Sequence, residues 1–194
     1  LGIGGASNYN LEMGAGQEKK ASGIAGTALS SLASSGLILA VIVLMFLKPL
    51  LTLFGATADV MPYAVDYTGI TALGLPFYIL SVGGNHIVRA DRSPTYSMVC
   101  IMIGAIINTI LDPLFIFGFG WGIKGAAWAT VIGQFASGVL VIVYFCKFRK
   151  MYLSGGMLKP KLSYLKVIIS LGLASCINQI AMAIVQIVLN NILR

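Results

Sequence analysis

Long apolar stretches without charge alternate with short charged segments along this chain. A transmembrane helix needs about 20 consecutive apolar residues, whereas a buried strand needs only about four to eight. Five intervals are long enough to cross a bilayer as helices: residues 21–47, 67–88, 93–111 (continuing past Asp112 to 123), 125–146 and 167–193. The pattern therefore predicts an all-α integral membrane protein, a polytopic helical bundle.

Residues 1–11 are also uncharged, but at about 1.5 Å per residue they cover only about half of the hydrocarbon thickness. The sequence begins with neither a methionine nor the pattern of a signal peptide. We therefore expect the chain to begin inside a helix, with further helices upstream.

The composition agrees with a membrane protein, because 58% of the residues are hydrophobic and only 10% are charged, against about a quarter in soluble proteins. The net charge of +7 does not form one basic patch, so we expect no nucleic-acid partner. Ten of the 13 lysines and arginines fall in residues 12–22, 89–94 and 147–166. The positive-inside rule then predicts that these three loops are cytoplasmic.

One carboxylate, Asp112, lies deep in an otherwise apolar stretch. An ionised side chain there is costly unless partners or water surround it, so such residues usually mark an ion or substrate path. The alternative is an aspartate at the outer boundary of the membrane that is simply hydrated, because Gly118 follows six residues later.

Two further polar residues are expected to share a pocket with Asp112. Asn108 lies four residues earlier, on the same helix face. Counting nine residues either way from a turn at Trp121 pairs Asp112 with Thr130. Carboxylate, amide and hydroxyl oxygens suit a hard cation such as Na⁺, and a proton could also use the carboxylate. For Thr130 the alternative is a hydrogen bond to its own helix backbone.

Two prolines interrupt the predicted spans. Pro76 lies inside the second span, two residues after Gly74, and a proline within a helix lacks a backbone donor and clashes with the preceding turn. We expect a kink there. Pro113 removes the hydrogen bond to the carbonyl of Thr109, which predicts either a gating bend or a proline that is tolerated near a helix end.

An enzyme is a minor alternative. His86 and Asp91 have the H-x-x-x-x-D spacing of glycerolipid acyltransferases, in which the histidine is a general base oriented by the aspartate. That activity would need a cytosolic α/β domain around the pair, and the sequence predicts none. We therefore expect no enzyme here.

Three segments resemble the multidrug and toxic compound extrusion (MATE) family. NTILDPLFIFGFGWGIKGAAWATVIGQ (residues 108–134) is similar to the family's fifth helix, outer loop and sixth helix. LEMGAGQEKKA (residues 11–21) and GNHIVRADRSP (residues 84–94) are similar to the loops after its second and fourth helices. The resemblance extends from the end of helix two through helix seven, nearly the whole chain.

The resemblance implies part of a fold with two six-helix lobes. Residues 1–146 would form most of the N-terminal lobe, without its first helix and part of its second. Residues 147–166 would be the cytoplasmic linker between the lobes, and residues 167–194 the first helix of the C-terminal lobe. The remaining helices of the same transporter and the lipid bilayer are the partners that this fold implies.

The family also implies a function and a site. It exports drugs and other amphipathic, often cationic, organic compounds across the cytoplasmic membrane in exchange for Na⁺ or H⁺. By motif and spacing Asn85, Asn108, Asp112 and Thr130 match its cation site, although hairpin counting places Asn85 about 11 Å closer to the cytoplasm than Asn108. We expect no cofactor or metal beyond this coupling ion. A related flippase of lipid-linked precursors or polysaccharides is the alternative.

Overall fold

The computed structural model describes residues 1–148 and 162–192, and these residues form helices joined by short turns. In chain order the helices are α1 (Gly2–Gly14), α2 (Glu18–Met45), α3 (Leu47–Leu53), α4 (Met61–Ala90), α5 (Pro94–Pro113), the π-helical turn η1 (Leu114–Gly118), α6 (Gly122–Val143), the π-helical turn η2 (Tyr144–Phe148) and α7 (Leu162–Ile192).

Five of the helical segments are long and apolar enough to cross a membrane, as the sequence predicts. They are Glu18–Met45, Met61–Ala90, Pro94–Gly118, Gly122–Lys147 and Ser163–Asn190. The all-α fold is therefore confirmed. The short helix α3 lies between the first two predicted spans. Helix also covers residues 147–148 and 162–166 at the two ends of the predicted linker, and residues 149–161 lie outside the described part.

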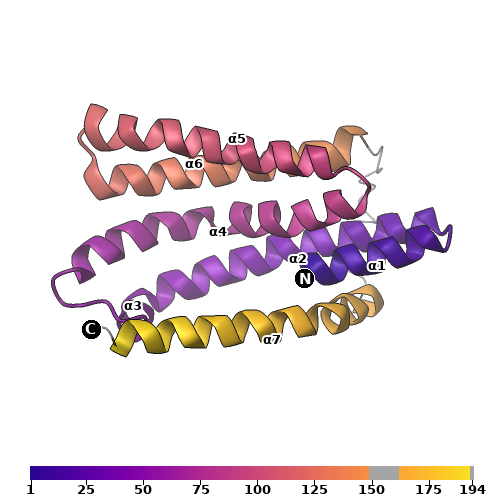
Figure 1. Cartoon of the computed structure of the whole chain (residues 1–194), viewed down its shortest axis with the longest axis horizontal. Coiled ribbons are helices and arrows are strands. Elements are labelled where there is room, and N and C mark those ends of the chain that lie inside the picture. Colours follow the sequence, from indigo (N-terminus) through magenta and orange to yellow (C-terminus); the bar gives the residue numbers. More distant parts are fainter. Residues whose placement is uncertain (149–161, 193–194) are drawn as a thin grey trace.

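The long helices lie roughly side by side, with α4 in the middle of the bundle (Figure 1). Helix α4 packs on α6 on one side and on α2 on the other, while α5 pairs with α6. Helix α7 runs along α1 and α2, and Gly4 of α1 lies directly against the backbone of α7 at Ile168. The arrangement places α4, α5 and α6 around a shared interior.

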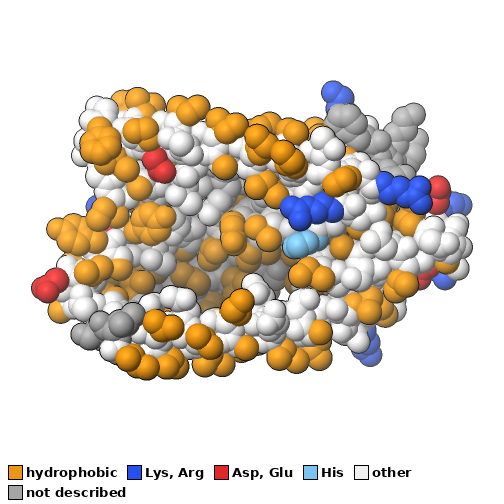
Figure 2. Space-filling model, in the orientation of Figure 1, with side chains coloured by type: hydrophobic (Ala, Val, Ile, Leu, Met, Phe, Trp, Pro, Cys, Tyr) orange, Lys and Arg blue, Asp and Glu red, His pale blue; other side chains and the backbone are white. Residues whose placement is uncertain are grey.

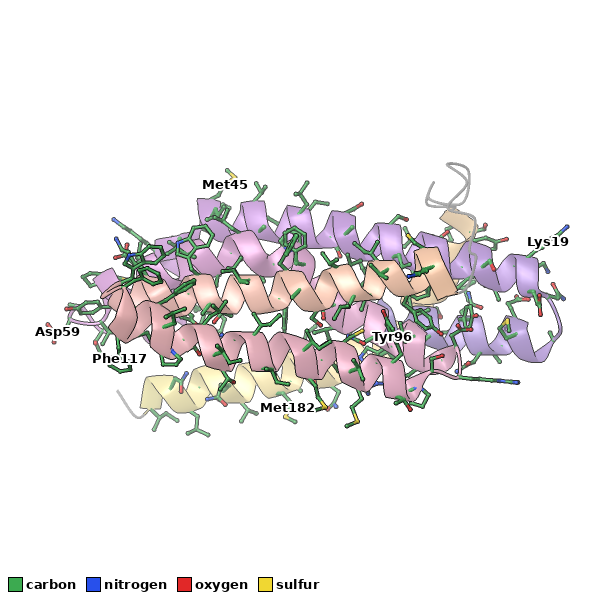
Figure 3. The ribbon with its side chains drawn as sticks, turned by 90° about the horizontal axis from the view of Figure 1, so that it is seen from above. Lys19, Met45, Asp59, Tyr96, Phe117 and Met182 are labelled. Atoms are coloured by element: carbon green, nitrogen blue, oxygen red, sulfur yellow. The ribbon has the colours of Figure 1, made fainter. Side chains whose placement is uncertain are left out.

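The turns divide between two ends of the bundle. Lys19 lies at one end, whereas Asp59 and Phe117 lie at the other (Figure 3). The α4–α5 turn shares the end of Lys19 and is closed by a helix-capping pattern, in which the Ser93 amide donates to the Val88 carbonyl and Arg92 adopts a positive φ of 60°. Helix α5 begins at Pro94, one residue into the predicted span 93–111.

Both prolines lie within continuous helix. Helix α4 runs through Pro76, and its ribbon changes direction near the middle of its length (Figure 1). Pro113 is the last residue of α5 and is followed directly by η1. A π-helical turn is one way for a helix to absorb a lost backbone hydrogen bond. A gating role for either proline stays a prediction.

Two glycines allow α5 and α6 to approach each other closely beside Asn108. A Cβ atom on Gly133 would lie 2.7 Å from the Gly104 carbonyl oxygen, and one on Gly104 would lie 2.9 Å from the Gly133 carbonyl oxygen. Real Cβ atoms do not approach backbone oxygens so closely. Because lipid supplies no hydrophobic drive between helices, such close backbone packing is a main source of helix association in membranes.

We therefore expect Gly133→Ala to destabilise the chain by about 1–3 kcal/mol, since the added methyl group forces α5 and α6 apart. Gly69→Ala is the matched control, because Gly69 is also helical but has no atom within 4 Å of its Cβ position. Unfolding in detergent measures both. A Gly133→Ala variant as stable as the control would show that this contact does not hold the pair together.

Candidate functional site

The structure brings together three of the four predicted site residues. The Asn108 amide nitrogen Nδ2 lies 3.4 Å from Asp112 Oδ1 on the next turn of α5 and 3.4 Å from Thr130 Oγ1 on α6. All three side chains are partly buried. Asn108 thus links the carboxylate of its own helix to the hydroxyl of the neighbouring one.

These contacts leave oxygen atoms available to a cation. Both hydrogen bonds of Asn108 are at the long limit of hydrogen bonding, so they hold its amide only weakly. The Thr130 hydroxyl donates to the Ala126 carbonyl at 2.9 Å, the backbone bond considered as the alternative from sequence, and still accepts from Asn108. Within the described residues Asp112 has no basic partner, since the ion pair found there joins Lys124 to Asp66.

Asn85 occupies a different position from the other three. Its side chain is 2% exposed, and its Nδ2 donates to the Ser81 carbonyl one turn earlier in α4. Its Oδ1 is buried and has no hydrogen-bond partner. No hydrogen bond joins Asn85 to Asn108, Asp112 or Thr130, all of which lie in the described part of the chain. It shares only a cavity with Asn108 and Thr130.

That cavity, which we call the inner cavity, lies between α4, α5 and α6 and has a volume of about 310 Å³. A second one of about 400 Å³, the outer cavity, lies between α2, α3, α4 and α6. A third of about 380 Å³, the α7 cavity, is bounded by α1, α4 and α7. Figure 2 shows that the face carrying α4 and α7 is hollowed between them.

Sequence reasoning missed Gln134, which lines both the inner and the outer cavity. Its Oε1 is buried without a hydrogen-bond partner and lies against Gly74, where a Cβ atom would overlap it. The spacing contained a signal, because Gln134 follows Thr130 by four residues and so extends the same helix face by one turn. The bonded hydroxyls of Ser81 and Ser137, 2.6 Å apart, were missed as well.

Among the described residues, His86 and Asp91 of the H-x-x-x-x-D pattern are not joined to each other, and Asp91 has other partners. Both oxygens of the buried Asp91 carboxylate accept hydrogen bonds from tyrosines, Tyr9 of α1 at 2.5 Å and Tyr144 of η2 at 2.7 Å. No hydrogen bond joins His86 to Asp91 within the residues that the structure covers, and no strand occurs there. Asp91 instead ties the α4–α5 turn to two other helical segments.

The chain is similar to known transporters over nearly its whole length. The MatE family model matches residues 1–114. The multidrug export protein MepA of Staphylococcus haemolyticus (strain JCSC1435) is 30% identical over 98% of this chain and 42% of its own length. MepA of Staphylococcus aureus (strain MSSA476) is 28% identical with the same coverage. The chain therefore spans less than half the length of these relatives.

Solved structures give the same result. The inward-facing conformation of a multidrug resistance MATE family transporter superposes with a TM-score of 0.89 at 26% identity, covering 98% of this chain and 44% of that one. Its outward-facing counterpart superposes with a TM-score of 0.85, covering 95% and 41%. With its apolar helices, this chain is part of a multi-pass membrane protein, and it belongs to the MatE family of multidrug and toxic compound extrusion transporters.

Proposed function

We propose that the protein containing this chain is an antiporter that exports amphipathic organic cations across the cytoplasmic membrane in exchange for Na⁺ or H⁺. The supporting observation is the partly buried Asp112 carboxylate, with Asn108 and Thr130 within hydrogen-bond reach on two helices and no basic partner among the described residues. Such a carboxylate gains stability from any cation that reaches it.

The chemistry of the three side chains fits a hard cation. Asp112 supplies charge, Thr130 a hydroxyl oxygen, and Asn108 an amide that can turn by about 180° to offer its oxygen instead of its nitrogen, since amide rotamers differ little in shape. Na⁺ would take the oxygens of all three, whereas a proton would bind the carboxylate alone. Either cation would neutralise Asp112 and so change which conformation of the transporter is favoured.

The orientation follows from the basic residues. Lys19 lies at one end of the bundle (Figure 3), and Lys20, Arg89 and Arg92 lie beside the two turns at that end, whereas Lys48 of α3 and Lys124 at the start of α6 lie toward the other end. We infer that the end carrying Lys19 is cytoplasmic, by the positive-inside rule. The cation site at Asp112 would then lie toward the outer side of the membrane, because Asp112 precedes the turn at Gly118 by only six residues.

Vesicles test this proposal directly. The full-length gene product that contains this chain is reconstituted, loaded with a fluorescent cationic dye and given a Na⁺ or H⁺ gradient without ATP. We expect dye movement under one gradient, stopped by an ionophore that dissipates it. If neither gradient moves dye, the antiport proposal is wrong, and a flippase of lipid-linked precursors becomes the better hypothesis.

A further inference from the structure

Three residues line both the inner and the outer cavity: Thr130, already described beside Asp112, and two others. Tyr78 of α4 lines the inner, outer and α7 cavities, and Gln134 of α6 lines the inner and outer ones. A compound passing between the inner and outer cavities would therefore contact both residues. Asp112 lines neither of these two cavities. A positively charged compound at this junction would therefore contact side chains other than the Asp112 carboxylate.

The buried polar atoms around the inner cavity contain an excess of acceptors. Gln134 Oε1 and Asn85 Oδ1 are both buried and lack hydrogen-bond partners. Each such oxygen is costly to bury, so a group that donates hydrogen bonds is favoured there. One of the hydroxyls of Ser81 and Ser137 donates to the other at 2.6 Å, so at most one hydroxyl hydrogen of this pair remains for the two unpartnered oxygens.

The Gln134 oxygen occupies space that a side chain at Gly74 would fill. The oxygen lies so close to the α4 backbone that any side chain at Gly74 would overlap it. The carbonyl end of the amide is thus fitted against α4 rather than extended into the membrane. An amide oxygen carries partial negative charge without being ionised, so it can accept from an ammonium group that must later leave.

Tyr78 adds an aromatic surface at the same junction. The residue is 46% exposed, which leaves much of its side chain open to the cavities. The face of a tyrosine ring attracts cations, including quaternary ammonium groups that cannot donate hydrogen bonds. Tyr78 and Gln134 therefore recognise two different properties of an organic cation, its charge and its N–H groups.

We propose that Tyr78 and Gln134 form a recognition site for a protonated amine of the exported compound. The Gln134 amide turns its oxygen from the buried position against Gly74 toward the cavity to accept a hydrogen bond from the N–H group, and the Tyr78 ring stacks on the cation. This inference rests on the proposed function and specifies its substrate class. It concerns substrate selection, whereas Asp112 concerns coupling to the ion.

The test uses two dansyl probes that differ only in their head group, a primary ammonium or a trimethylammonium, and measures equilibrium binding to the purified full-length gene product. Gln134→Met keeps the length of the side chain but removes its polar atoms. We expect it to weaken primary ammonium binding about tenfold and to change trimethylammonium binding by less than about twofold. Tyr78→Leu should weaken both probes, about threefold or more.

Two further variants make the test decisive. Gln134→Glu places a negative charge at the junction and should tighten both probes, even if Gln134→Met folds poorly. Gln186→Met is the matched control, because Gln186 is exposed on α7 and bonds only within that helix to Asn190; it should change neither probe.

Equal weakening of both probes by Gln134→Met, or none, together with no tightening by Gln134→Glu, would overturn this site while leaving antiport intact. A wild-type protein that binds neither probe would contradict the export of organic cations as well.

Discussion

Replacing Asp112 by asparagine is expected to lower ion-driven export strongly while leaving the protein folded. The substitution keeps the size of the side chain and can keep the hydrogen bond to Asn108, but it removes the charge that attracts a cation. If ion binding at Asp112 drives the conformational change, the loss of coupling should lower gradient-driven dye export about tenfold or more. The measurement is the initial rate of dye movement in vesicles under the driving gradient.

Asp66→Asn is the control for this prediction. Asp66 is an exposed aspartate near the start of α4 that pairs with Lys124 at 3.3 Å and lines none of the three cavities described above. Exposed ion pairs contribute little, so its variant should export at the wild-type rate. Normal gradient-driven export by Asp112→Asn would remove Asp112 from the coupling mechanism.

Asp91→Ala is expected to have the largest effect on stability, about 3 kcal/mol. The carboxylate is 6% exposed and accepts from Tyr9 and Tyr144, which lie 82 and 53 residues away in the sequence. Alanine would deprive these buried hydroxyls of a charged acceptor, and each hydrogen bond to a charged group contributes about 1.5–3 kcal/mol. Chemical unfolding of the purified chain in detergent measures the change.

Two other substitutions decide whether this effect comes from the tyrosine contacts. Asp91→Asn keeps one carbonyl acceptor and should recover part of the loss. Asp59→Ala removes an aspartate that is exposed in the α3–α4 loop and should change stability by less than about 0.5 kcal/mol. An Asp91→Ala variant as stable as Asp59→Ala would show that the buried network contributes nothing.

The spacing of apolar and polar residues predicts the helical fold and the grouping of Asp112 with Asn108 and Thr130, because both depend on geometry between residues close in sequence. Asn108 and Asp112 are one helical turn apart, and Thr130 is brought back beside them by a tight turn near Trp121. Helical spacing and equal depth in the membrane are enough to place such residues. Their coupling role and Na⁺ or H⁺ specificity stay predictions.

The other contacts depend on helices that are distant in sequence, and periodicity carries no information about them. The pairing of Tyr9 with Asp91 requires the packing of α1 beside the end of α4. The junction at Gln134 requires that α4 and α6 lie side by side at Gly74. Hydropathy also cannot separate α5 from the π-helical turn that follows Pro113, because both belong to one apolar span.

The packing of α7 on α1 has a consequence for biosynthesis. Ile168 is completely buried, and Gly4 of α1 lies against the backbone at that residue. Because α1 is synthesised long before α7, the face of α1 that carries Gly4 stays uncovered by α7 until α7 has been inserted. A chaperone or the insertase could bind this face of α1 during that interval.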